Sequence, residues 1–254
     1  MNELEKGNAE FTRVLMSEVQ QKTAQLTDAL ELLTQSYDDT LEMLGSALEL
    51  KDPETSGHSQ RVTAYTISIA KSVPVPLPYL TVLARAAFLH DIGKMAIPDK
   101  IFHKPGPLDD AEKVIMRTHC EIGYNMLTRI PFLRDAADIV LAHHEFFDGT
   151  GYPRGLRGEQ IPLGARIISI ANALDARLSD WPYRNALPML HGLEEIRHCA
   201  GTQFDPKIVE VFLSIPKNHF AELRENLGSP FRLTGLRNMG FAPQEYPPNL
   251  PEQE

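Results

Sequence analysis

The first fifty residues carry an apolar stripe at the spacing of an α-helix. Its members recur in steps of three and four along the chain: Leu30, Leu33, Tyr37, Leu41, Leu44 and Leu48. This heptad-like spacing continues less regularly upstream to Leu4. Because the heptads run for only about three repeats, the stripe favours a coiled coil between two chains but also fits a helix packed on its own domain. We predict a parallel homodimer through residues 26–48.

Helical spacing recurs in the rest of the chain, and no segment shows the alternating apolar and polar pattern of a strand. Asp52-Pro53 suits the end of one helix and the start of another, and Asp109 with Glu112 suits a capping box. Further helices are predicted at residues 54–72, 79–90, 109–127, 133–144, 165–179, 188–199 and 206–213. The chain is therefore predicted to be all-α, a helical bundle preceded by one long helix.

The predicted helices and the prolines divide the chain into three parts. Residues 1–50 form the N-terminal helix, which we expect to serve dimerisation or signalling. Residues 51–228 hold the remaining helices and a loop rich in glycine and proline. Residues 229–254 are rich in proline, which predicts a loosely packed tail.

Composition excludes several classes of protein. A chain of 254 residues with 43% hydrophobic and 23% charged residues is typical of a globular domain. No apolar run is long enough to cross a membrane, and the N-terminus lacks the order of a secretion signal, so we expect a cytoplasmic protein. A formal charge of -9 argues against binding to DNA or to anionic membrane. Cys120 and Cys199 lack CxxC spacing, so we expect ordinary thiols rather than a disulfide or a thiolate zinc site.

Histidine is concentrated beside other ligand-type residues in the middle of the chain. His90-Asp91 ends an apolar helix, His143-His144 ends a later one, and His119 lies between them. A single histidine in such a place is more often hydrogen-bonded or solvated than bound to metal. Together, imidazole and carboxylate groups without thiolates are typical ligands of iron, manganese, zinc or nickel. Their number predicts a site for two or three ions.

Three further residues extend this group. Glu54 and His58 are four positions apart in the helix predicted to begin at Pro53, so both side chains would lie on one face and share one ion. Lys94 follows Asp91 by about one turn, so its ammonium group could lie at the same site. The alternative for Lys94 is a lysine at a helix end in solvent.

Three stretches of sequence carry a resemblance to a known family: HDIGK at 90–94, HHEFFDGTGYP at 143–153 and IPLGARIISIA at 161–171. In these stretches the chain resembles the HD-GYP family, a branch of the HD-domain metal-dependent phosphohydrolases. Shorter matches extend the resemblance over residues 50–215: IFHKPGPL at 101–108, WPYR at 181–184 and QFDP at 203–206.

The resemblance implies a fold, an activity and a cofactor. Family members are all-helical domains that bind cyclic di-GMP and hydrolyse its phosphodiester bonds to the linear dinucleotide pGpG, to GMP, or to both. They carry iron or manganese in a centre of two or three divalent ions. The mechanism expected here is attack by a metal-bridged hydroxide, with Asp91 bridging two ions and Lys94 beside the phosphate.

Position by position, the family pattern implies eight metal ligands: Glu54, His58, His90, Asp91, His119, His143, His144 and Asn172. The last is a departure, because the family has an aspartate where this chain has Asn172. A neutral amide oxygen attracts a cation less than a carboxylate does. Asp175 matches the family's second aspartate, which we expect to have a positioning or structural role.

The substrate side of the site follows from the same pattern. Gly151 and Tyr152 lie in the loop after the paired histidines, where glycine permits close approach and the tyrosine ring would stack on a base or bond a phosphate. The alternative is a tight connecting loop. Arg184 keeps one basic position that is expected to hold phosphate, whereas Trp181 replaces an arginine of the family.

Three functions are compatible with these residues. The first is an active cyclic di-GMP phosphodiesterase. The second is a degenerate domain that binds metal or nucleotide and acts as a signalling or interaction module, which Asn172 and Trp181 would explain. The third is hydrolysis of another nucleotide or phosphate ester. The N-terminal helix is expected to link the domain to a second copy and to a sensory or diguanylate cyclase (GGDEF) partner.

Overall fold

The computed structural model describes residues 3–51, 57–180 and 185–226. In these ranges every regular element is helical, and the only pairing of strand type is an isolated bridge between Ala200 and Phe204. The prediction of an all-α chain is therefore confirmed. None of the helices in these ranges combines the length and apolar character needed to cross a lipid bilayer.

Four helices enclose the core: α2 (His58–Lys71), α3 (Leu77–Leu89), α7 (Arg134–Ala142) and α8 (Leu163–Leu178). Each turns its apolar face inward, and Val62, Leu83, Val140 and Ile170 are completely buried. The prolines between α2 and α3 end the first helix, and Pro78 suits the first turn of the second because that turn has no carbonyl partner for an amide.

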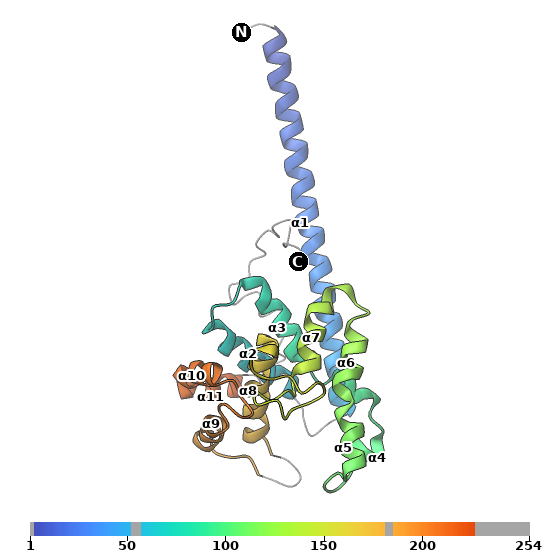
Figure 1. The fold of residues 1–254 in the computed structure, drawn as a ribbon. Coiled ribbons are helices and arrows are strands. Elements are labelled where there is room, and N and C mark those ends of the chain that lie inside the picture. Colours follow the sequence, from blue (N-terminus) through green and yellow to red (C-terminus); the bar gives the residue numbers. More distant parts are fainter. Residues whose placement is uncertain (1–2, 52–56, 181–184, 227–254) are drawn as a thin grey trace.

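Two groups of helices flank this core on opposite sides (Figure 1). One group contains α4 (Asp99–Phe102), α5 (Asp110–Arg117) and α6 (His119–Leu127). The other contains α9 (Met189–His198), α10 (Pro206–Ser214) and α11 (Lys217–Asn226). Short 3₁₀ turns lie at η2 (Ile92–Ala96), η3 (Pro131–Leu133) and η4 (Gly158–Gln160).

Two predicted helices differ from the structure. The helix predicted at residues 54–72 begins only at His58, because Gly57 precedes it with a φ of 71°, a left-handed conformation that an α-helix cannot continue through. Glu54 lies outside the described residues. The helix predicted at residues 109–127 is interrupted at Thr118, where α5 ends and α6 begins. Its predicted capping box is confirmed by the reciprocal bonds of Asp109 and Glu112, both 2.9 Å long.

Helix α11 has no counterpart in the sequence prediction. Charged and polar residues dominate it, so its apolar periodicity is weak. Its attachment depends on Phe220, which is almost completely buried and lies edge-on to Tyr65 with ring centroids 5.7 Å apart. The proposed division into three domains stays a prediction, since residues 227–254 are also outside the described ranges.

Helix α1 (Glu3–Lys51) extends far beyond the other helices, and only its C-terminal part lies against them (Figure 1). On this part Leu41 and Leu48 are buried, and Tyr37 stacks on Phe132 with ring centroids 4.2 Å apart. The structure therefore differs from the predicted seam at residues 37–48, because these side chains pack within the chain.

The last turn of α1 is bonded to the end of η2 and to the residues that follow it. The Lys51 ammonium donates to the carbonyl oxygens of Met95 and Ile97 at 3.0 and 2.7 Å. It also pairs with Asp99 at 3.2 Å. These bonds fix the base of the long helix on the domain.

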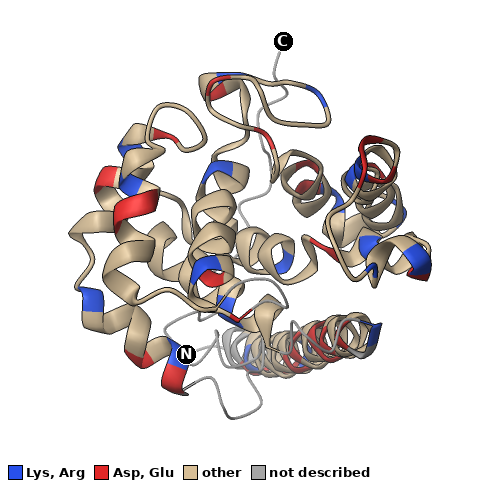
Figure 2. Cartoon of the chain, turned by 90° about the horizontal axis from the view of Figure 1, so that it is seen from below, with Lys and Arg blue, Asp and Glu red and all other residues tan. Residues whose placement is uncertain are grey.

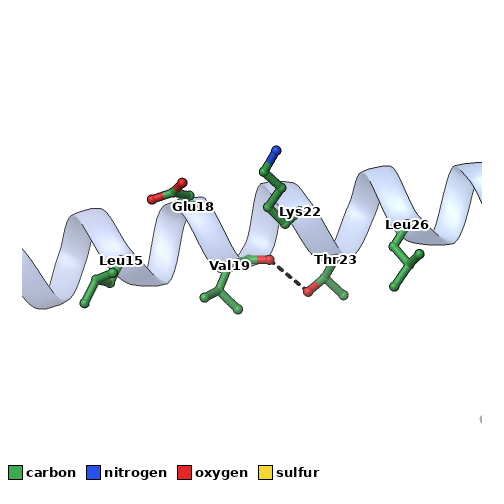
Figure 3. Close-up of a pocket in the computed structure, with 6 residues that line it drawn as sticks. All are labelled: Leu15, Glu18, Val19, Lys22, Thr23 and Leu26. Carbon is green, nitrogen blue, oxygen red and sulfur yellow. Dashed lines mark hydrogen bonds between the residues drawn. The ribbon is translucent and has the colours of Figure 1, made fainter.

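The N-terminal part of α1 keeps its apolar side chains exposed. Six of them expose between 43% and 65% of their surface: Phe11, Leu15, Val19, Leu26, Leu30 and Leu33. Figure 3 shows a shallow pocket along this part, lined by Leu15, Glu18, Val19, Lys22, Thr23 and Leu26. Figure 2 shows Lys and Arg residues intermixed with Asp and Glu residues over the helices in this view.

The turn η2 is held against α6 by a very close approach of two backbones. A Cβ added at Gly93 would lie 2.0 Å from the carbonyl oxygen of His119 and 2.7 Å from the amide nitrogen of Gly123. These backbone atoms cannot withdraw unless η2 and α6 separate. Gly93 is therefore required at this position for packing.

Replacing Gly93 by alanine is expected to lower the free energy of unfolding by about 3 kcal/mol, because the added methyl group overpacks a backbone contact. Urea denaturation followed by circular dichroism measures the change. Gly7→Ala is the control, since a Cβ at this exposed position of α1 meets no atom within 4 Å and alanine favours the helix. Equal stability of the two variants would contradict the close approach.

Candidate metal centre

Four histidines lie at helix ends that converge in the interior. His58 and His119 are the first residues of α2 and α6, and His90 and His143 directly follow α3 and α7. All four are buried. The apolar helix α3, for example, is followed directly by the buried polar side chain of His90. Its place at the helix end lets this side chain reach the interior without interrupting the apolar face of the helix.

The same helix ends orient three of the rings. In His90, His119 and His143, Nδ1 lies between 2.6 and 2.8 Å from the carbonyl oxygen three residues earlier. Carbonyl groups in the last turn of a helix are not fully used by the helix's own amides, so they can accept these bonds. Because a carbonyl oxygen only accepts, Nδ1 must carry the ring hydrogen.

His58 follows the same rule with a carboxylate. Its Nδ1 lies 2.7 Å from Asp175 Oδ2 on α8, and an ionised carboxylate only accepts. Each of the four rings therefore presents Nε2 with a free lone pair. Fixing one ring nitrogen by a hydrogen bond so that the other can bind an ion is typical of metal-binding histidines.

Asp91 lies between these four nitrogens. Its Oδ2 atom is 3.1 Å from His90 Nε2 and 3.8 Å from His58 Nε2. Its Oδ1 atom is 3.5 Å from His119 Nε2 and 4.0 Å from His143 Nε2. One carboxylate thus faces two pairs of imidazoles, one pair on each oxygen.

Several of these atoms are acceptors that face one another. His119 Nε2 and His143 Nε2 are 3.4 Å apart, and neither carries a hydrogen when both hydrogens are on Nδ1. His90 Nε2 and Asp91 Oδ1 are buried without a hydrogen-bond partner. Buried acceptors that face one another are unfavourable unless a cation or a proton lies between them. The donor set therefore fits two metal ions, one on each side of Asp91.

The surroundings keep the side chains in the protonation states that bind metal. Burial raises the pKa of Asp91, but the neighbouring His90 and Lys94 outweigh it and hold the pKa well below its usual value. Burial lowers the pKa of His143 and His144 well below the usual range, and it also lowers the pKa of His119. The result is an ionised Asp91 carboxylate beside neutral rings of His119, His143 and His144.

Asp175 bonds the ring of His58, which fits the positioning or structural role expected from the sequence. It is almost completely buried, holds His58, and accepts from Arg61 Nε at 2.6 Å and Arg224 Nη1 at 3.1 Å. Burial alone would raise the pKa of Asp175, but the bonds from His58 and Arg61 lower it to about 2. Through Arg224, helix α11 is connected to the ring of His58.

Lys94 belongs to the centre and is not a solvated lysine at a helix end. Its ammonium group donates to Asp91 Oδ2 at 2.7 Å, and its side chain is 22% exposed. A partly exposed cation at the edge of a buried carboxylate is placed to meet an anionic ligand that enters from solvent.

His144 extends the histidine group toward the loop that follows α7. Its ring centroid is 4.1 Å from that of His143 and 5.1 Å from that of His119. The ring of Tyr152 stacks on His144 at 4.8 Å, and the exposed Arg117 guanidinium lies over the Tyr152 ring at 4.9 Å. Tyr152 therefore already has an aromatic and a cationic neighbour. Sequence reasoning assigned no role to Arg117.

The loop is held in place by Glu145, another residue without a role in the sequence prediction. Its carboxylate is buried and accepts from the amides of Arg154 and Leu156 at 2.7 and 2.9 Å. Gly151 lies against the same chain, since a Cβ there would be 2.2 Å from the amide nitrogen of Phe146. The sequence did offer one indication of a role for Glu145, namely its position directly after the paired histidines His143 and His144.

Cys120 also lies at the centre, although its spacing in the sequence predicts no metal role. Its Sγ atom is 3.5 Å from His119 Nε2, and burial raises the pKa of the thiol. Cys199 is half-buried at the end of α9.

The remaining predicted site residues are placed only in part. Asn172 is half-buried on α8, one turn before Asp175, and its side chain makes no hydrogen bond to the described part of the chain. Glu54, Trp181 and Arg184 lie outside the described residues.

Known proteins are similar in sequence to the part of the chain that holds this centre. The family described as HD domain matches residues 42–208. A cyclic di-GMP phosphodiesterase of Thermotoga maritima is 40% identical over 181 residues, which are 70% of this chain and 49% of the relative. The cyclic di-GMP phosphodiesterase response regulator RpfG of Xanthomonas campestris pv. campestris is 40% identical, covering 69% of this chain and 47% of the relative.

Relatives named for a different cyclic dinucleotide are nearly as similar. The 3'3'-cGAMP-specific phosphodiesterase 3 of Vibrio cholerae is 39% identical over 68% of this chain and 37% of the relative. The chain thus spans less than half the length of each of these three relatives.

The fold is shared with a solved structure. The crystal structure of a cyclic GMP-AMP specific phosphodiesterase of V. cholerae, V-cGAP3, superposes with a TM-score of 0.59 at 21% identity, covering 81% of this chain and 54% of that one. The matched family spans well over half of the chain and contains every histidine of the centre. The chain therefore belongs to the HD-domain family, in its HD-GYP branch.

Proposed function

We propose that this chain is a metal-dependent phosphodiesterase that hydrolyses cyclic di-GMP to pGpG, to GMP, or to both. The observation that carries the proposal is the carboxylate of Asp91, which faces a pair of imidazoles with each of its oxygens. A carboxylate shared by two ions is typical of enzymes that cleave phosphate esters. The names of the relatives support a cyclic dinucleotide as the substrate.

Two ions, iron or manganese, would be held on the two sides of Asp91. His58 and His90 would complete one pocket, and His119, His143 and His144 the other. Asn172 shares a face of α8 with Asp175, which supports a place beside His58 for its amide oxygen. Glu54 is proposed for a third ion. When bound, such ions polarise the phosphate and activate water.

The chain's own residues would bind and orient the substrate. Lys94 presents a positive charge beside Asp91, where it would neutralise a phosphate oxygen. Gly151, Tyr152 and Arg184 are proposed to contact the nucleotide, with the loop fixed by Glu145. The helix-end bonds keep the imidazole nitrogens in place without reorganisation during turnover.

The test is anaerobic turnover by protein reconstituted with ferrous iron or manganese, with cyclic di-GMP and 3'3'-cGAMP as parallel substrates and products separated by chromatography. Metal-dependent formation of pGpG or GMP is expected. The His143→Ala variant should lose about a hundredfold in turnover and lose metal while its circular dichroism is unchanged. Absence of turnover in protein shown to hold metal would favour the degenerate signalling module.

Asn172→Asp is expected to raise turnover about tenfold, because it restores the negative charge that an amide ligand lacks. The measurement is the same assay at limiting metal. Asn125→Asp is the matched control, since it adds the same charge on an exposed part of α6. A turnover unchanged by Asn172→Asp would show that the amide is an adequate ligand and would contradict the expectation.

The stability of the metal-free protein is expected to fall as the pH drops from about 7 to about 5. The folded-state pKa of His143 and of His144 is lowered by burial, whereas in the unfolded chain each titrates near 6.5. Below that pH the unfolded chain binds more protons, so the free energy of unfolding decreases. Urea denaturation at stepped pH measures it. The slope should be smaller in His143→Gln, and an unaltered slope would argue against this cause.

Two copies of the chain are proposed to pair through the exposed residues 11–33 of α1. The supporting observation is the row of exposed apolar side chains from Phe11 to Leu33, beyond the part of α1 that packs on its own domain. Such a row is typical of a surface that is covered by a partner. A sensory or diguanylate cyclase partner for this helix stays a prediction of the sequence.

Leu30→Glu is expected to convert a dimer to a monomer, because it places a charge within this row. Light scattering at micromolar concentration measures the mass. Leu32→Glu is the control, since Leu32 is 72% exposed and lies about 200° around the helix from Leu30. A monomeric mass for the unmodified chain would contradict the proposed pairing.

A further inference from the structure

Cys120 brings a sulfur atom into one of the two pockets beside Asp91. Its Sγ atom is 3.5 Å from His119 Nε2. The four possible ligand atoms of His119, Cys120, His143 and His144 all lie within 4.8 Å of one another. Cys120 is completely buried, so the sulfur faces the imidazoles and not solvent. With Asp91 Oδ1, which faces the same pocket, these three nitrogens and one sulfur offer an ion five ligand atoms.

The chain reaches this arrangement through the break between α5 and α6. Adjacent residues of one helix diverge by about 100° around its axis, so neighbouring side chains do not normally meet. Here the His119 ring turns back to the carbonyl oxygen of Met116, which is 2.8 Å from Nδ1. Nε2 is thereby left within reach of the Cys120 sulfur.

An independent observation, an unpartnered carboxylate oxygen, also points to a cation in this pocket. Asp91 Oδ1 is buried, has no hydrogen-bond partner, and is 3.5 Å from the same nitrogen of His119. His143 Nε2 faces His119 Nε2 at 3.4 Å, and both are acceptors. The carboxylate oxygen and the two nitrogens therefore surround a place suited to a cation, next to the sulfur.

We propose that Cys120 is a ligand of the ion in this pocket, together with His119, His143 and His144. The inference rests on the proposed metal-dependent function and deepens it. On binding, the S–H bond breaks, its proton passes to solvent, and a metal–sulfur bond forms. The two sides of Asp91 then differ in chemistry: His58 and His90 offer only nitrogen, whereas the second pocket adds a thiolate. Soft thiolate ligands select iron or zinc over manganese.

Cobalt substitution of the full chain tests the proposal without measuring turnover. Cobalt(II) bound to a thiolate has a strong sulfur-to-metal charge-transfer band in the near ultraviolet, whereas nitrogen and oxygen ligands give none. The unmodified chain and the control Cys199→Ser should both show the band. Cys120→Ser and Cys120→Ala should lack it while still binding cobalt in the pocket of His58 and His90. Circular dichroism shows that these variants are folded.

The outcomes separate this inference from the proposed function. Two bound cobalt ions without the band, or a band that persists in Cys120→Ala, would overturn the sulfur ligand and leave the metal-dependent function intact. A chain that binds no cobalt, iron or manganese would overturn both.

Metal competition gives a second readout. The preference for zinc over manganese in the second pocket, measured from bound metal after dialysis against both ions, should fall about tenfold or more in Cys120→Ser. A ratio equal to that of Cys199→Ser would overturn the proposal.

Discussion

The orientation of the imidazoles by helix ends is the constraint on which the rest of the centre depends. Each of His90, His119 and His143 donates through Nδ1 to a carbonyl in the last turn of the helix that precedes it. One bond therefore satisfies the helix and fixes the ring. The packing of α3, α5 and α7 then determines where the three Nε2 atoms meet, so errors in helix packing would be transmitted directly to the centre.

The outer contacts extend this constraint to the whole domain. Asp175 on α8 bonds His58 and Arg61 on α2 and Arg224 on α11. One carboxylate thus connects three helices. Glu145 fastens the loop on the other side through two backbone amides. The buried carboxylates of Asp175 and Glu145, around the centre, are thus hydrogen-bonded. Within the centre, His90 Nε2 and Asp91 Oδ1 are acceptors without a hydrogen-bond partner. This contrast distinguishes a ligand site from an ordinary polar core.

The sequence predicted the helices with continuous apolar stripes. It also predicted the six residues that gather around Asp91: His58, His90, Lys94, His119, His143 and His144. Spacing alone could not show that the segment from Asp109 to Leu127 is interrupted, because the interruption is a single turn at Thr118, whose amide and hydroxyl both donate to the carbonyl oxygen of Ile115. It also could not show Cys120 beside the histidines, because adjacent positions normally diverge on a helix. The apolar stripe of α1 was also ambiguous. A helix that packs on its own domain and a helix that pairs with a second chain require the same apolar spacing.

Helix α1 has a mechanical consequence for the domain. Its 49 residues form a rod of roughly 73 Å. Lys51 clamps the base of this rod to the carbonyl oxygens of Met95 and Ile97, in the segment that directly follows Asp91 and Lys94. A rod held at one end acts as a lever, so a small swing or twist at its free end becomes a torque on that segment. A force applied to the far end of α1 would therefore act on the Asp91 carboxylate between the two imidazole pairs without a ligand binding at the centre.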